Sequence, residues 1–92
     1  MTISLHRQFI EQVLRRPSVI RAAVFDAMLA LPEAFRHPAR HTGLGLRKLH
    51  ASGVWEARIG LELRMLVQMA PDTAVLRFLG THNEVRKYLK NL

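Results

Sequence analysis

The spacing of apolar residues changes halfway along the chain, from a helical period to a strand period. In the first half, apolar side chains recur at helical spacing in two stretches, 4–15 and 18–36. From Leu46 onward they alternate with polar side chains in short segments separated by turn residues, at 46–50, 54–59, 61–69 and 73–79. The first pattern indicates amphipathic helices and the second indicates half-buried strands. The chain therefore predicts an α+β fold, with two helices packed on one face of an antiparallel meander of about four strands.

Proline and capping residues mark where the predicted elements end. Pro17 separates the two helices, and Pro32 is expected to end or kink the second one. The stretch 37–45 has no periodicity and is interpreted as a connecting loop. Thr81 and Glu84 have the spacing of a capping box, which predicts a short C-terminal helix. That helix carries an apolar stripe made of Val85, Tyr88, Leu89 and Leu92.

Composition limits the class of protein. The 92 residues, of which 49% are hydrophobic and 23% charged, have the make-up of a folded chain and are interpreted as one domain, 1–92. The chain has no cysteine, which excludes disulfides and cysteine-based metal sites. No apolar run reaches the roughly 20 residues of a membrane span, and the N-terminus lacks the apolar stretch of a signal peptide. We therefore expect a cytoplasmic protein.

An excess of arginine is the first indication of a binding partner. Fourteen Lys and Arg residues face seven Asp and Glu, for a net charge of +7, and eleven of the fourteen are Arg. Ten of the cations but only four of the anions lie in residues 36–92. The planar guanidinium group suits two-pronged contacts with phosphate. The basic C-terminal part therefore favours a polyanionic partner.

The alternation of apolar and charged residues fixes the register of the second and third predicted strands. A three-residue loop at 60–62 pairs Ala57 with Met65 and keeps the apolar side chains on one face. A two-residue loop would mix the two faces. The three-residue loop also places Arg58 directly opposite Arg64 on the polar face.

This register gathers arginines on the polar face. The next hairpin is expected to bring Arg77 beside or diagonal to Arg64, with only Glu56 as a nearby anion. Like charges opposite each other destabilise a sheet by about 1 kcal/mol. In one interpretation the arginines splay apart in solvent and Glu56 neutralises one of them. In the other the face binds an anion, and Lys48 and His50 on the preceding strand extend it.

Three further residues are candidates for packing or for chemistry. His82 is expected at the first position of the last helix, where it could exchange a proton or simply cap the helix. Tyr88 lies in the apolar stripe of that helix, so packing is its simpler interpretation. Trp55 alternates with polar neighbours on its strand and is expected in the core.

Residues 43–90 resemble the RelE/ParE superfamily of bacterial toxins from type II toxin–antitoxin modules. The similarity rests on four pieces in a fixed order: K-L-H before a turn, W-x-x-R-I on the next strand, L-R-x-L-V on the strand after it, and G-T-H ahead of a helix with a tyrosine. The resemblance implies a RelE-like α+β fold.

The resemblance to the RelE branch also implies a ribosome-dependent mRNA endonuclease. In this reaction a 2′-hydroxyl attacks the adjacent phosphate in the ribosomal A site, which requires a base, cations and an acid but no metal or other cofactor. Arg64 matches the family's phosphate-stabilising arginine, His82 a proposed general acid, and Tyr88 a base-stacking tyrosine. Glu56, which stands where some members have a strand lysine, competes with His50 for the role of base.

The same resemblance implies the partners. They are a cognate antitoxin protein, which would form a hetero-oligomer with the toxin, and the ribosome with its mRNA; no membrane is implied. The residues expected to bind RNA are Lys48, Arg58, Arg77, Arg86 and Lys87. Two alternatives stay open: a ParE-like inhibitor of DNA gyrase, and a non-catalytic RNA-binding relative.

Overall fold

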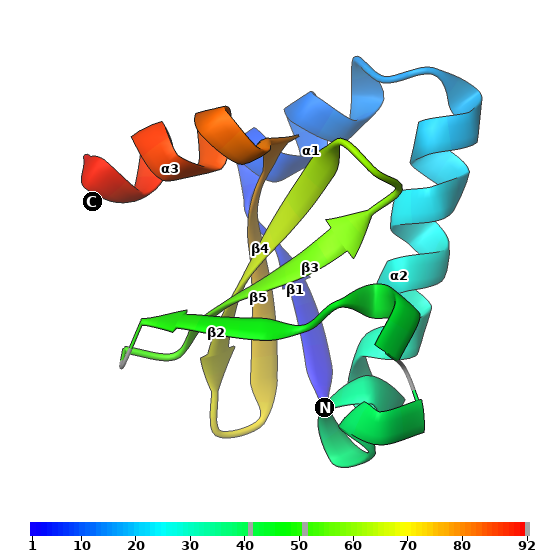
Figure 1. The fold of residues 1–92 in the computed structure, drawn as a ribbon, viewed down its shortest axis with the longest axis vertical. Helices are drawn as coiled ribbons and strands as arrows, with labels where there is room; N and C mark the ends of the chain where they lie inside the picture. The colour runs from blue at the N-terminus through cyan, green and yellow to red at the C-terminus, as the bar shows by residue number, and fades with distance from the viewer. Residues whose placement is uncertain (41, 51, 92) are drawn as a thin grey trace.

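Residues 1–40, 42–50 and 52–91, which the computed structural model describes, form three helices and a five-stranded sheet (Figure 1). In chain order the elements are β1 (Thr2–Leu5), α1 (Arg7–Leu14), α2 (Ser18–Arg36), two 3-10 turns (Pro38–Arg40 and Thr42–Leu44), β2 (Arg47–His50), β3 (Val54–Ile59), β4 (Leu63–Ala70), β5 (Thr73–Thr81) and α3 (His82–Lys90). The strand order is β1-β5-β4-β3-β2, and each neighbouring pair is antiparallel except β1 with β5. The predicted α+β class is confirmed.

The strand β1 corrects the helix predicted over 4–15 and adds a fifth strand to the predicted sheet. Thr2–Leu5 pairs in parallel with Thr73–Leu76, so that β1 covers one edge of β5. An open edge would leave backbone N–H and C=O groups of β5 unpaired. Beyond the end of β1, the helix α1 covers the edge of β5. There the Gln12 side chain accepts a hydrogen bond from the Leu79 amide at 2.7 Å.

The helix α2 confirms the prediction over 18–36, but Pro32 does not end it. Pro32 lies inside α2, and the helix continues to Arg36. Proline lacks an N–H group, so one backbone hydrogen bond of the helix is missing at this point. The predicted loop over 37–45 contains the two 3-10 turns.

The β3–β4 hairpin has the predicted register. Ala57 pairs with Met65, and Arg58 pairs with Arg64. Gly60 opens the connecting loop with φ +65, a left-handed conformation that glycine adopts without strain. The two arginines therefore face each other close to the tip of the hairpin.

The main core lies between the sheet and the helices α1 and α2. Its largest fully buried side chains are Phe9, Val24, Leu31, Met65, Val67, Leu76 and Leu79. Trp55, which was expected in the core, packs against its border and stays half-buried. Its ring meets that of Phe35 edge-on, with centroids 5.2 Å apart. This packing holds α2 against one face of the sheet.

The helix α3 lies on the opposite side of the sheet from α2, which corrects the expectation of helices on one face only (Figure 1). Val54, Leu66 and Val85 are buried under it, and Leu49, Phe78, Tyr88 and Leu89 pack around them. The face that was expected to be polar is therefore apolar where α3 covers it. It is charged only beside the helix.

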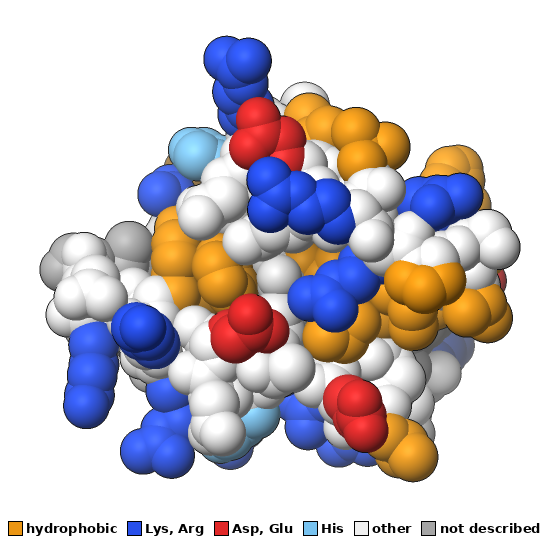
Figure 2. All heavy atoms as spheres, turned by 90° about the horizontal axis from the view of Figure 1, so that it is seen from above, with side chains coloured by type: hydrophobic (Ala, Val, Ile, Leu, Met, Phe, Trp, Pro, Cys, Tyr) orange, Lys and Arg blue, Asp and Glu red, His pale blue; other side chains and the backbone are white. Residues whose placement is uncertain are grey.

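Large apolar side chains stay exposed on the outer surface of α1 and α2. They are Ile10 and Leu14 on α1 and Val19, Phe25 and Leu29 on α2, and Leu5 at the end of β1 is exposed beside them. A hollow of about 220 Å³ lies between the two helices, and its lining includes the charged residue Arg21. Figure 2 shows exposed apolar side chains next to Lys and Arg on the side where α2 lies. Within the described ranges, no helix has the length and apolar character needed to cross a bilayer.

Candidate functional site

Arg64 is fixed by the hairpin that carries it. It stands opposite Arg58 on β3 and opposite Gly80 on β5. Its Nη1 donates a hydrogen bond to the Leu63 carbonyl at 3.0 Å, and its Nε lies 3.7 Å from Glu56 Oε1. Its side chain is 20% exposed. The guanidinium group is therefore held in place by the backbone before any ligand arrives, and part of it reaches the surface.

Arg58 turns away from Arg64. Its side chain lies against Gly45, where a Cβ atom would be only 3.3 Å from Arg58 Nε. Gly45 has φ +59, which also favours glycine at this position. The two arginines thus splay apart, as one of the two interpretations expected, and Glu56 neutralises part of the charge of Arg64.

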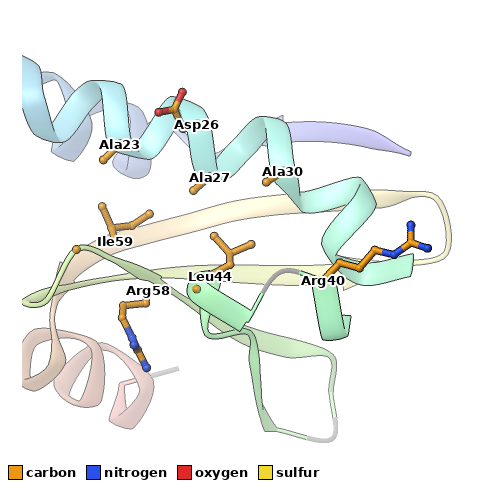
Figure 3. A pocket seen from close by; sticks show the side chains of 10 residues that line it. Ala23, Asp26, Ala27, Ala30, Arg40, Leu44, Arg58 and Ile59 are labelled. Atoms are coloured by element: carbon orange, nitrogen blue, oxygen red, sulfur yellow. The ribbon is translucent and has the colours of Figure 1, made fainter. Parts of the chain in front are cut away.

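A hollow of about 470 Å³ lies near Arg58, on the α2 side of the sheet (Figure 3). The helix α2 lines it with three alanines and Asp26, and the loop lines it with Leu44 and Arg40. In Figure 3, the Arg58 side chain extends away from α2. Arg58 lines the hollow, but its guanidinium group points away from α2 and toward the charged face.

A bulge separates Arg77 from Arg64, so the predicted position of Arg77 beside or diagonal to Arg64 is wrong. Leu66 pairs with Phe78, and the register then shifts by one residue, which leaves Arg77 as the extra residue of β5. Phe78 takes the position diagonal to Arg64. Arg77 instead lines a small hollow together with Val54, Leu66, Val67, Gln68 and Tyr88.

The register of β2 corrects the prediction for Lys48. Lys48 pairs with Trp55 and shares its face of the sheet, the face covered by α2. Arg47 pairs with Glu56 and lies on the charged face, with its Nη2 3.5 Å from Glu56 Oε1. Strict alternation from the His50–Val54 pair would place Lys48 opposite Glu56, but a bulge between Lys48 and His50 shifts the register and places Arg47 there, which the sequence pattern does not show. The backbone of His50 belongs to β2, and its side chain lies outside the described part of the chain.

The helix α3 begins at the same end of the sheet as Arg64. The predicted capping box is present: Thr81 Oγ1 accepts from the Glu84 amide at 3.2 Å, and Glu84 Oε1 accepts from the Thr81 amide at 2.8 Å. The hydrogen bonds from the Thr81 amide and hydroxyl hold the pKa of Glu84 below its ordinary value of 4.5. His82 is the first helical residue and is exposed, two positions after the Gly80 that pairs with Arg64.

Tyr88 is half-buried in the apolar cluster between α3 and the sheet, and its ring stacks on that of Phe78. The two ring centroids are 4.5 Å apart and the planes are inclined by 30°. Both rings line an open hollow of about 410 Å³ together with Glu84, Lys87 and Asn91. Arg86 is exposed on the same helix. The predicted packing role of Tyr88 is confirmed. Phe78 joins Tyr88 in the hollow because the bulge in β5 places it on this face, which alternation from Arg77 did not predict.

Comparison with models of protein families and with the sequences of curated proteins finds no match. Solved structures do match. The RelB–RelE antitoxin–toxin complex from Methanococcus jannaschii aligns with a TM-score of 0.67 and 16% identity, over 92% of this chain and 96% of that chain. The toxin–antitoxin complex RelBE2 from Mycobacterium tuberculosis gives 0.64 and 21%, over 88% and 96%. The DinJ–YafQ complex from E. coli gives 0.61 and 14%, over 90% and 94%.

These alignments cover most of both chains at low sequence identity, so they establish the architecture. The resemblance found in residues 43–90 is confirmed at that level. The chain has the fold of the RelE-like toxins.

Proposed function

We propose that the protein is a toxin that cleaves mRNA on the ribosome, in the cytoplasm, and that a cognate antitoxin protein holds it inactive. The fold supports a toxin, and solved structures with this fold include a RelB–RelE antitoxin–toxin complex and a DinJ–YafQ complex. The net charge of +7 supports a polyanionic target.

The observation that carries the proposal is the grouping of Arg64, Arg58 and His82 at one end of the charged face. Arg58 and Arg64 pair across the β3–β4 hairpin, and His82 starts α3 just beyond the residue that pairs with Arg64 on β5. Attack by a 2′-hydroxyl builds negative charge on the phosphate and requires a proton for the departing 5′-oxygen. In the proposal, Arg64 stabilises that charge and His82 supplies that proton.

Other residues of this face have proposed roles in holding the message. The rings of Phe78 and Tyr88 border an open hollow in which a nucleobase could stack. Arg58, Arg77, Arg86 and Lys87 are proposed to contact backbone phosphates. The sequence leaves two candidates for the general base, Glu56 and His50.

The test uses purified ribosomes carrying a defined message. We expect the protein to cut within the A-site codon, to leave a cyclic phosphate on the upstream fragment, and to leave ribosome-free message intact. Primer extension locates the cuts. Intact message combined with inhibition of gyrase supercoiling would select the gyrase inhibitor instead, and binding of RNA without any cut would select the non-catalytic relative.

A further inference from the structure

Glu56 is the one buried charged residue in the described ranges, with 9% of its side chain exposed. Its Oε1 lies 3.5 Å from Arg47 Nη2 and 3.7 Å from Arg64 Nε. Burial of a carboxylate is unfavourable by several kcal/mol unless cations compensate for it. A general base must come within about 3.2 Å of the hydroxyl that it deprotonates. Glu56 would have to leave both guanidinium groups and the interior to do so.

Arg47 differs from Glu56 in exposure, with 63% of its side chain accessible to solvent. Its distance of 3.5 Å from the carboxylate is longer than the roughly 2.7–3.2 Å of a well-formed N–H···O bond. Its guanidinium group is therefore oriented by Glu56 but keeps donors free for a ligand.

Arg47 and Arg64 approach the same carboxylate oxygen from different strands. Arg47 is on β2, Arg64 is on β4, and Glu56 lies between them on β3. The cluster of two guanidinium groups and one carboxylate carries one net positive charge. Because the carboxylate is buried and Arg47 is exposed, an anion arriving from solvent meets the cations first.

We propose that Arg47 binds the phosphate at the cleavage site together with Arg64. Glu56 is a positioning residue that holds the two guanidinium groups, and it is not the general base. The inference rests on the proposed nuclease function and names a phosphate-binding residue for it. Arg47 is then the cation that β2 contributes to the charged face, because Lys48 lies on the opposite face of the sheet.

Single-turnover cleavage of ribosome-bound message by Arg47→Ala, Arg47→Lys and Glu56→Gln tests this assignment. Removal of one preorganised donor from a developing anion slows a reaction by about 100-fold or more, which is the effect expected for Arg47→Ala. Arg47→Lys keeps the charge but loses the planar fork, and we expect an intermediate rate. In wild type, replacement of a non-bridging oxygen of the scissile phosphate by sulfur should slow cleavage. In Arg47→Ala, most of this slowing by sulfur should disappear.

Glu56→Gln separates positioning from base catalysis. Glutamine keeps a side-chain oxygen that can face both guanidinium groups, so we expect a loss of less than about 10-fold and an unchanged shape of the pH–rate profile. A general base at this position predicts a loss of about 100-fold or more and the disappearance of the acid limb.

The chain provides a matched control at the end of α2. Glu33 also faces two arginines, with Arg36 Nη2 at 3.2 Å and Arg40 Nη1 at 3.6 Å. Arg36→Ala and Glu33→Gln should cleave at the wild-type rate, because this cluster lies away from the charged face.

Each outcome separates the two proposals. A wild-type protein that leaves ribosome-bound message intact contradicts the nuclease function itself. Wild-type cleavage together with a normal rate for Arg47→Ala overturns the assignment of Arg47 alone. Loss of the acid limb of the pH–rate profile in Glu56→Gln overturns the assignment of Glu56 as a positioning residue. If Glu56→Gln fails to fold, the exposed Arg47 variants still decide the result.

Discussion

Gly80 illustrates how one small residue shapes the charged face. It is buried opposite Arg64, and a Cβ atom on it would lie 2.7 Å from Phe78 Cε2 and 3.1 Å from Glu84 Cβ. The missing side chain therefore lets the Phe78 ring lie across the strand, where it stacks on Tyr88. It also leaves room for the capping carboxylate of Glu84.

We predict that Gly80→Ala destabilises the protein by about 1–3 kcal/mol, the usual effect of overfilling a tightly packed site. Urea unfolding measures the change. Gly43→Ala is the control, because no neighbouring atom lies within 4 Å of a Cβ at that position. Equal midpoints for the two variants would show that Phe78 does not pack against Gly80.

At the scale of the element, the capping box of α3 makes stability depend on pH. The pKa of Glu84 is lowered in the folded state by the hydrogen bonds from Thr81. The stabilisation is therefore fully present above the ordinary value of 4.5 and is lost as the pH falls through the folded-state pKa. We predict that Glu84→Gln reduces the free energy of unfolding more at pH 7 than at pH 3, because the stabilisation by the carboxylate decreases as the pH falls below 4.5.

Urea unfolding at both pH values measures this difference, and the exposed Glu62→Gln controls for the change in net charge. An equal loss at pH 7 and pH 3 would contradict the role of the Glu84 carboxylate.

Patterns within single elements predict the hairpin and the cap, because parity and capping are local. The pairing of Arg58 with Arg64 follows from alternation alone. The strand β1 is only four residues long, and its identity depends on the open edge of β5, which no local pattern contains. The bulge that displaces Arg77 interrupts alternation without a local signal.

The position of α3 did have a signal in the sequence. Val54 and Leu66 are apolar residues on the face interpreted as polar, and they need a cover. The stripe of Val85, Tyr88 and Leu89 provides it.

At the scale of the whole molecule, two surfaces could receive the proposed antitoxin: the charged face, and the apolar surface of α1 and α2. We predict that a partly acidic segment of the antitoxin covers the face that carries Arg58 and Arg64, where it would block the message. Its affinity should then fall as salt rises, and Arg58→Gln should weaken that dependence. Titration calorimetry at several salt concentrations measures both effects. An affinity independent of salt would point instead to the hollow between α1 and α2.

The most direct test of the central claim is the cleavage rate of ribosome-bound mRNA by Arg64→Lys and His82→Gln. Arg64→Lys keeps the charge but loses the fork that stabilises the phosphate, so cleavage should fall markedly while binding to the ribosome changes little. His82→Gln should slow cleavage by roughly 100-fold or more if the imidazole donates the proton. Both variants must unfold at the wild-type midpoint. If both cut the message at the wild-type rate, the active site is not on this face.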